Sequence, residues 1–100
     1  MTIGNKIKEL RENKGMLQRE LAAKLFIGEG YLSKIENNQK MPKRVDLKII
    51  SNLFQTDISE LETLWLANKI YEIIKEEDQG IAALKVAEKQ AKYTKSKKND

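Results

Sequence analysis

The spacing of apolar residues is the feature that most constrains how this 100-residue chain can fold. Apolar side chains recur at three- and four-residue intervals, as in Ile3, Ile7 and Leu10. Val, Thr and aromatic residues nowhere cluster with the period-two alternation that indicates a half-buried strand. A repeat close to 3.6 residues is typical of amphipathic helices, so the sequence predicts an all-α fold.

Residues that end helices divide the first half of the chain into short segments. Gly15 can adopt the left-handed conformation that closes a helix, and Pro42 keeps the residue before it out of the helical region. Ile27 and Gly28 are interpreted as a turn. We therefore expect helices at about 3–14, 18–26 and 29–37, followed by a loop at 38–43.

Two further helices are predicted after this loop. Apolar residues from Leu47 to Phe54 indicate a fourth helix. Glu60 lies three residues after Asp57, which is the separation found in a capping box. This pair marks the start of a fifth helix that should continue to about Glu77.

Gly80 leaves two interpretations of the C-terminal region open. Asp78-Gln79-Gly80 resembles a break before a weaker sixth helix that reaches about Ala91. Alternatively, one helix passes through Gly80 at a cost of about 1 kcal/mol relative to alanine. Polar and charged residues dominate the segment 93–100, and we expect it to be a disordered basic tail.

Composition excludes several classes of function. The chain contains no cysteine and no histidine, so it lacks thiolate metal ligands, disulfides and the commonest general base. We expect no enzyme activity, no cofactor and no metal.

Residues Met1 to Leu10 alternate charged and apolar side chains, unlike a secretory signal, and no apolar run approaches the ~18 residues of a membrane span. A cytoplasmic protein is expected.

The net charge of +4 is unevenly distributed. Residues 1–56 carry eleven Lys and Arg against six Asp and Glu, whereas residues 57–100 carry eight against nine. A basic first half favours a polyanionic partner, and nucleic acid is favoured over membrane because no strongly apolar face accompanies the charge. A basic surface that only confers solubility is about equally consistent with the charge alone.

The predicted helices at 18–26 and 29–37 form two short helices joined by a turn. In that arrangement one helix can lie in the major groove of DNA while the other crosses the backbone. Around them the chain has, in order, Gly15-Met16-Leu17-Gln18-Arg19-Glu20-Leu21-Ala22, then Leu32-Ser33-Lys34-Ile35-Glu36-Asn37-Asn38, then Pro42. Over about residues 3–61 this combination resembles the Xre/Cro-type helix-turn-helix family of phage and bacterial repressors.

The resemblance implies a five-helix repressor-like domain at 1–61, followed by a C-terminal helical extension at 62–92. It also implies that the first residue of the second helix hydrogen-bonds DNA, and that an arginine and a glutamate, here Arg11 and Glu36, form a structural ion pair. Lys34 is the best candidate for guanine O6 and N7. The DNA-binding residues implied are Gln18, Arg19, Glu29, Gly30, Tyr31, Ser33, Lys34, Asn38, Lys40 and Lys43.

Some of these positions depart from the family pattern or allow another interpretation. Leu17 and Gly28 stand where side-chain helix caps are usual. Glu29 and Gly30 replace polar donors, which leaves the base preference open. Tyr31 could contact a sugar or a thymine methyl, or simply cover Leu21.

The second half contains an apolar stripe that a small repressor core does not need. Residues 57–91 carry four Lys against eight Asp and Glu, so this region is a poor DNA surface. We predict a homodimer whose interface includes Trp65, Ile70, Ile73 and Ile74, although the helix could instead fold back over the first and fourth helices. A C2 dimer would set two recognition helices about 34 Å apart on a pseudo-palindromic operator.

The predicted function is a sequence-specific DNA-binding transcriptional regulator, acting as a dimeric repressor that reads the major groove with helix 29–37. The alternative is an antitoxin or another protein whose C-terminal helices bind a second protein.

Overall fold

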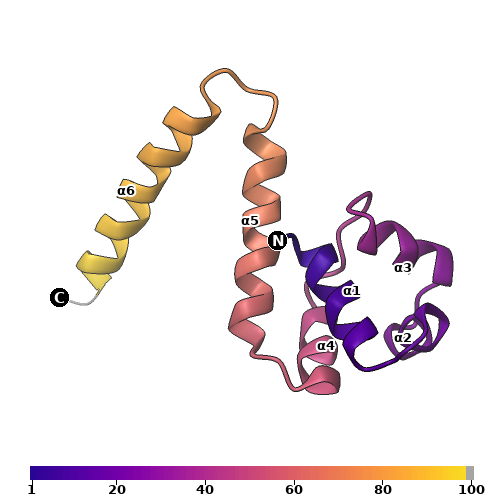
Figure 1. Ribbon diagram of the computed structural model, residues 1–100. Coiled ribbons are helices and arrows are strands. Elements are labelled where there is room, and N and C mark those ends of the chain that lie inside the picture. The colour runs from indigo at the N-terminus through magenta and orange to yellow at the C-terminus, as the bar shows by residue number, and fades with distance from the viewer. Residues whose placement is uncertain (99–100) are drawn as a thin grey trace. The chain divides into compact units, whose positions relative to one another are not determined.

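The computed structural model describes residues 1–98, and within this range every regular element is an α-helix (Figure 1). The all-α prediction is therefore confirmed. The helices are α1 (Ile3–Asn13), α2 (Gln18–Leu25), α3 (Glu29–Glu36), α4 (Asp46–Phe54), α5 (Ile58–Ile74) and α6 (Gly80–Lys98). The chain divides into two compact units, Met1–Asn68 and Lys69–Asp100. None of the described helices is both long and apolar enough to cross a membrane.

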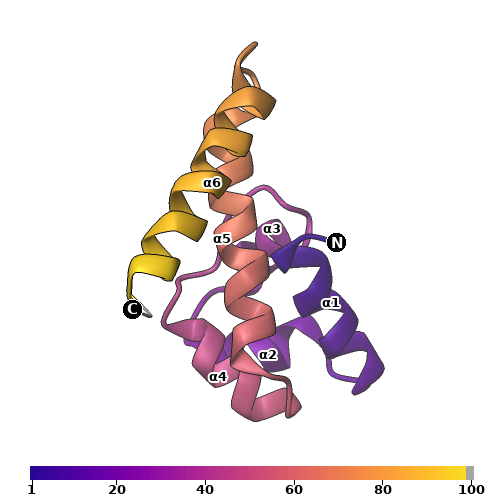
Figure 2. The same ribbon diagram turned by 90° about the vertical axis from the view of Figure 1, so that its left-hand side faces the viewer.

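The first unit is held together by the apolar faces that the sequence pattern indicated. In both views α1 to α4 gather into one bundle (Figures 1 and 2). Burying such side chains provides most of the stabilisation of a small domain, at about 1.5–3 kcal/mol for each large aliphatic residue. The most deeply buried side chains are those of Ile3, Ile7, Leu21, Leu32, Ile35, Leu47, Ile50 and Leu61.

The beginning of α5 belongs to this first unit. Leu61 is fully buried in its core, and Asn68 Oδ1 accepts a hydrogen bond of 3.0 Å from the backbone N–H of Ile3. Lys6 Nζ lies 3.1 Å from Glu60 Oε1, and this hydrogen bond raises the pKa of Lys6. The compact unit thus extends to Asn68, beyond the limit at 61 that the family resemblance implied.

The turn between α2 and α3 contains a strained residue. Phe26 ends α2 with a φ of 57°, in the left-handed region that glycine and asparagine adopt more easily. Its side chain is 91% exposed, so little burial offsets the strain. Sequence reasoning placed this turn correctly but attributed it to Ile27 and Gly28.

The second unit consists of the end of α5, a turn and α6. Gly80 begins α6, which supports the interpretation of a break over one continuous helix. A Cβ atom at Gly80 would lie 2.6 Å from the carbonyl oxygen of Ile74, so the close approach of the two helix ends requires glycine.

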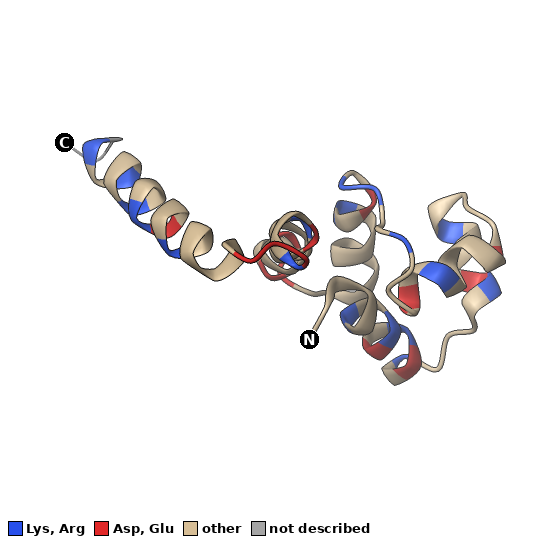
Figure 3. Cartoon of the chain, turned by 90° about the horizontal axis from the view of Figure 1, so that it is seen from above, with Lys and Arg blue, Asp and Glu red and all other residues tan. Residues whose placement is uncertain are grey.

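The C-terminal end differs from the prediction of a disordered tail. α6 continues through Lys98, and residues 99 and 100 lie outside the described range. The prediction relied on the absence of an apolar face, but lysine, which supplies three of the six residues 93–98, has high helix propensity even without one. Lys92 and Glu88 also form an i, i+4 pair at 3.8 Å. Lysines recur along α6, where Glu88 is the single acidic residue in the described range (Figure 3).

Candidate nucleic-acid interface

A buried ion pair joins the end of α1 to the end of α3. Arg11 Nε donates to Glu36 Oε2 at 2.8 Å, and Arg11 Nη2 donates to Glu36 Oε1 at 3.0 Å. Both residues are buried, and hydrogen bonding to Glu36 raises the pKa of Arg11. Arg11 Nη1 also donates to the backbone oxygen of Met16 at 2.8 Å, just before α2. The pair therefore fixes α1, α3 and the approach to α2, which is a structural role.

Gln18, the first residue of α2, is connected to the same carboxylate. Its Nε2 donates to Glu36 Oε1 at 3.0 Å. An amide NH₂ group has two protons to donate, so one remains for a phosphate oxygen or a base acceptor. The ion pair thus orients the side chain that was predicted to contact DNA. Sequence reasoning named all three residues but did not find this connection.

The start of α2 is capped in an unexpected way. Leu17 has no side-chain oxygen to accept from the first turn, as the sequence indicated. Glu20 instead accepts from the backbone N–H of Leu17 at 2.9 Å, which is the reciprocal half of a capping box. Gly28 precedes α3 without any side-chain cap. The N-terminus of α2 is therefore better capped than Leu17 suggested, whereas the N-terminus of α3 has no side-chain cap.

The outward face of α3 carries part of the predicted reading surface. Leu32, Ile35 and Glu36 are buried on the inner face. Gly30 and Lys34, which are four residues apart and exposed, lie on the opposite face in successive turns. Glu29 is exposed at the front of the helix, and Ser33 is half-buried at its side.

Tyr31 points toward the loop that follows α3. Its hydroxyl group donates to the backbone oxygen of Met41 at 3.3 Å, and its side chain is 37% exposed. This hydrogen bond was not among the alternatives that the sequence left open for Tyr31. It ties α3 to the segment that carries the predicted phosphate-binding lysines.

Asn38 makes two contacts within the protein. It adopts a φ of 65°, in the left-handed conformation expected for it. Its Oδ1 accepts from Thr2 Oγ1 at 2.6 Å, and its Nδ2 donates to Asn5 Oδ1 at 3.1 Å. The side chain thus joins the end of α3 to the start of α1, and its predicted phosphate contact would compete with these bonds.

Gly4 makes this junction possible. A Cβ atom there would lie 2.2 Å from the backbone oxygen of Ile35 and 2.8 Å from Asn38 Oδ1. Sequence reasoning did not single out Gly4, because a glycine near a helix start is common and its neighbours come from a distant part of the chain.

The loop after α3 is held by an aromatic side chain from α5. Trp65 Nε1 donates to the backbone oxygen of Pro42 at 2.9 Å, and the Arg44 guanidinium lies 5.3 Å from the Trp65 ring centroid. Arg44 also pairs with Glu62 at 3.2 Å. Lys40 and Lys43 are exposed on this loop. Trp65 was predicted at the dimer interface, but in this structure it packs partly buried against the core and positions the loop.

The remaining residues of the predicted interface lie in the second unit. Ile70 is 43% exposed and Ile73 is 73% exposed, while Ile74 is half-buried.

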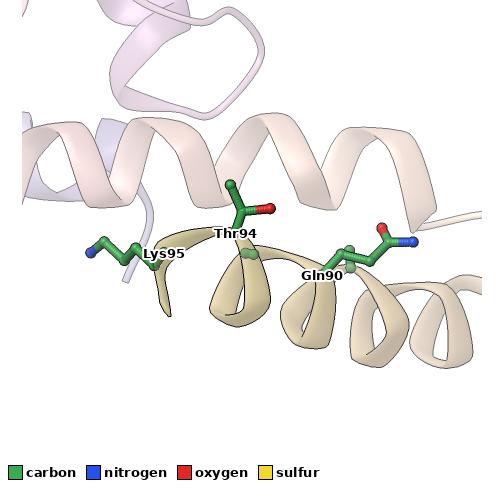
Figure 4. Close-up of a pocket in the computed structure, with 5 residues that line it drawn as sticks. Gln90, Thr94 and Lys95 are labelled. Atoms are coloured by element: carbon green, nitrogen blue, oxygen red, sulfur yellow. The ribbon is translucent and has the colours of Figure 1, made fainter. Parts of the chain in front are cut away.

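Farther along, a hollow on α6 is lined by residues from consecutive turns, of which Gln90, Thr94 and Lys95 are labelled in Figure 4. Among the described residues no cluster of acidic side chains could hold a metal ion.

Comparison with known proteins agrees with this geometry. The family model described as helix-turn-helix matches residues 7–61. The HTH-type transcriptional activator BcrR of Enterococcus faecalis is 34% identical over 61 residues, which is 61% of this chain and 30% of that protein. The HTH-type transcriptional regulator ImmR of Bacillus subtilis (strain 168) is 36% identical over 61 residues, or 61% of this chain and 48% of that protein. The chain thus spans less than half the length of these relatives.

A solved structure is similar along nearly the whole chain. The structure described as a SinR protein/SinI protein complex is 27% identical, with a TM-score of 0.53. The match covers 99% of this chain and 100% of that one. The likeness therefore includes the C-terminal helices as well as the part matched by the family model.

Proposed function

Because the chain belongs to the Xre/Cro-like helix-turn-helix family, we propose that it is a sequence-specific, DNA-binding transcriptional regulator acting in the cytoplasm. The observation that carries this proposal is the Arg11–Glu36–Gln18 network. It joins the end of α1, the start of α2 and the end of α3. A rigid scaffold of this kind holds an exposed helix in the geometry needed to enter a groove. No catalytic activity is proposed.

In this proposal α3 lies in the major groove and reads base edges, with Lys34 contacting guanine. Gln18 and Arg19 at the start of α2 contact the DNA backbone. Lys40 and Lys43, in the loop after α3, do the same. Such phosphate contacts position the protein, whereas contacts in the groove provide sequence preference. Tyr31 and Trp65 support the loop through the backbone oxygens of Met41 and Pro42.

The proposed active form is a homodimer that acts as a repressor. Ile70 and Ile73 expose apolar surface beyond the end of the first unit, where a second copy would bury it. A C2 arrangement would present two copies of α3 to a pseudo-palindromic operator.

A second candidate is a partner-binding protein in which the same helices bind a different chain. The similarity to the structure described as a SinR protein/SinI protein complex supports this candidate. Purification of the native protein separates the two candidates. A lone homodimer supports the repressor, and a stoichiometric heterologous partner supports the second candidate.

The proposed reading of DNA is tested at Lys34. With a fluorescently labelled duplex selected by the wild-type protein from a random pool, Lys34→Ala should weaken binding by about 5- to 150-fold, the effect of losing one specific base contact. Lys24→Ala is the matched control, because Lys24 is an exposed lysine on α2 outside the proposed contact set. Equal losses for the two variants would contradict the role of Lys34, and no binding by the wild type would contradict the function.

A further inference from the structure

Contacts within the protein do not explain why residue 30 is a glycine. A Cβ atom built on Gly4 or Gly80 would meet backbone atoms at 2.2 or 2.6 Å, and Gly15 has a φ of +69°. At Gly30 no atom lies within 4 Å of the added Cβ, and the residue has ordinary helical geometry. A glycine in a helix is less favourable than alanine. Folding alone therefore does not account for glycine at this position.

Gly30 lies near the start of the outward face of α3. The buried side chains of Leu32, Ile35 and Glu36 define the inner face, and Gly30 lies opposite them, one turn before Lys34. Lys34 is the next exposed residue on this face of the helix. The predicted reading surface therefore has a stretch of bare backbone one turn before its basic side chain.

The chemistry of the major groove limits what can lie against this bare backbone. Base edges there present hydrogen-bond donors and acceptors and a single type of apolar protrusion, the C5-methyl group of thymine. A bare Cα has no side-chain group with which to hydrogen-bond a base. The backbone N–H groups of the first turn point along the helix axis and not outward. A methyl group is therefore the best complement.

We infer that Gly30 is a specificity-determining residue that admits a thymine methyl group beside the base contacted by Lys34. This inference rests on the proposed function, in which α3 enters the major groove. A side chain at position 30 would occupy the space of the methyl group and hold the helix away from the base pair.

The test combines a protein change with a base change. The probes are the duplex selected by the wild-type protein and versions in which single thymines of a half-site are replaced by uracil, which lacks the methyl group. At one position, uracil should weaken wild-type binding about fourfold, the effect of one buried methyl group. Gly30→Ala should weaken binding to the thymine duplex at least about tenfold, through the clash, yet bind the uracil duplex more tightly than the thymine duplex.

Stability measurements separate this effect from misfolding. Gly30→Ala should melt at the same or a higher temperature than the wild type, because alanine favours the helix. Asn52→Ala is the control for helix stabilisation alone, since Asn52 is exposed on α4 outside the proposed DNA surface. It should leave DNA affinity unchanged.

Several results would overturn the inference while leaving the function intact. One is that Gly30→Ala binds the thymine duplex as tightly as the wild type does. Another is that no replacement of thymine by uracil weakens binding of the wild type. The third is that the losses in binding free energy from Gly30→Ala and from uracil are additive. Failure of the wild type to bind any duplex in a salt-sensitive manner would instead overturn the proposed function.

Discussion

Replacing Glu36 by alanine is expected to destabilise the first unit by about 3–5 kcal/mol. The change removes both carboxylate oxygens that bind Arg11, at 2.8 and 3.0 Å, and leaves a buried guanidinium with the Met16 carbonyl and a distant contact of 4.0 Å to the exposed Glu12 carboxylate. It also removes the acceptor of Gln18. Because the stability of a whole domain is about 5–15 kcal/mol, a substantial part of the variant should unfold at moderate temperature. Urea denaturation followed by circular dichroism measures the difference.

Two controls identify the buried charge as the cause. Glu62→Ala removes the exposed partner of Arg44 and should change stability by no more than about 1 kcal/mol. The double change Arg11→Met with Glu36→Leu removes both charges together and should be far less damaging than Glu36→Ala alone. A Glu36→Ala variant as stable as Glu62→Ala would show that the pair does not hold the domain together.

The second large effect is expected at Ile73. Its side chain is 73% exposed, so Ile73→Asp should leave the fold of the chain unchanged while placing a charge in the proposed dimer interface. Two linked binding events typically exceed a single one by about 10²–10⁴ in affinity. The monomeric variant should lose about that factor on a two-half-site duplex. Light scattering after size exclusion gives the mass, and fluorescence anisotropy gives the affinity.

Val45→Asp provides the matched control for the oligomeric state. Val45 is 75% exposed but lies in the first unit, outside the proposed interface, so this variant should remain dimeric. If Ile73→Asp also remains dimeric, the interface does not include this part of α5. If it becomes monomeric with unchanged affinity, dimerisation does not determine DNA binding.

The sequence predicted those parts of the fold that depend on local pattern. The helix at 3–14, the turn that closes at Gly15 and the break near Gly80 all follow from apolar spacing and from residues with special backbone preferences. The Arg11–Glu36 pair was found through the family resemblance and not through spacing. The tail was wrongly expected to be disordered over 93–98, because polarity predicts exposure and does not exclude a helix.

The rest of the site depends on contacts between distant residues. The bond from Gln18 to Glu36, the junction of Asn38 with Thr2 and Asn5, and the bond from Trp65 to Pro42 span 18 to 36 positions along the chain. Residue type shows that each of these side chains can form hydrogen bonds, but their partners are decided by tertiary packing. Gly30 was singled out from the sequence as a departure from the family pattern, but the open space around it could be found only in the structure.

Binding to DNA through phosphate contacts should weaken steeply as the salt concentration rises, so a salt titration tests whether this chain is a DNA-binding regulator. Fluorescence anisotropy would measure the association constant of the full chain for its selected duplex at increasing salt concentration. If each subunit of a dimer neutralises about four phosphates, a plot of log K against log salt should have a slope near −7. A slope near zero, or no binding at low salt, would contradict a DNA-binding function.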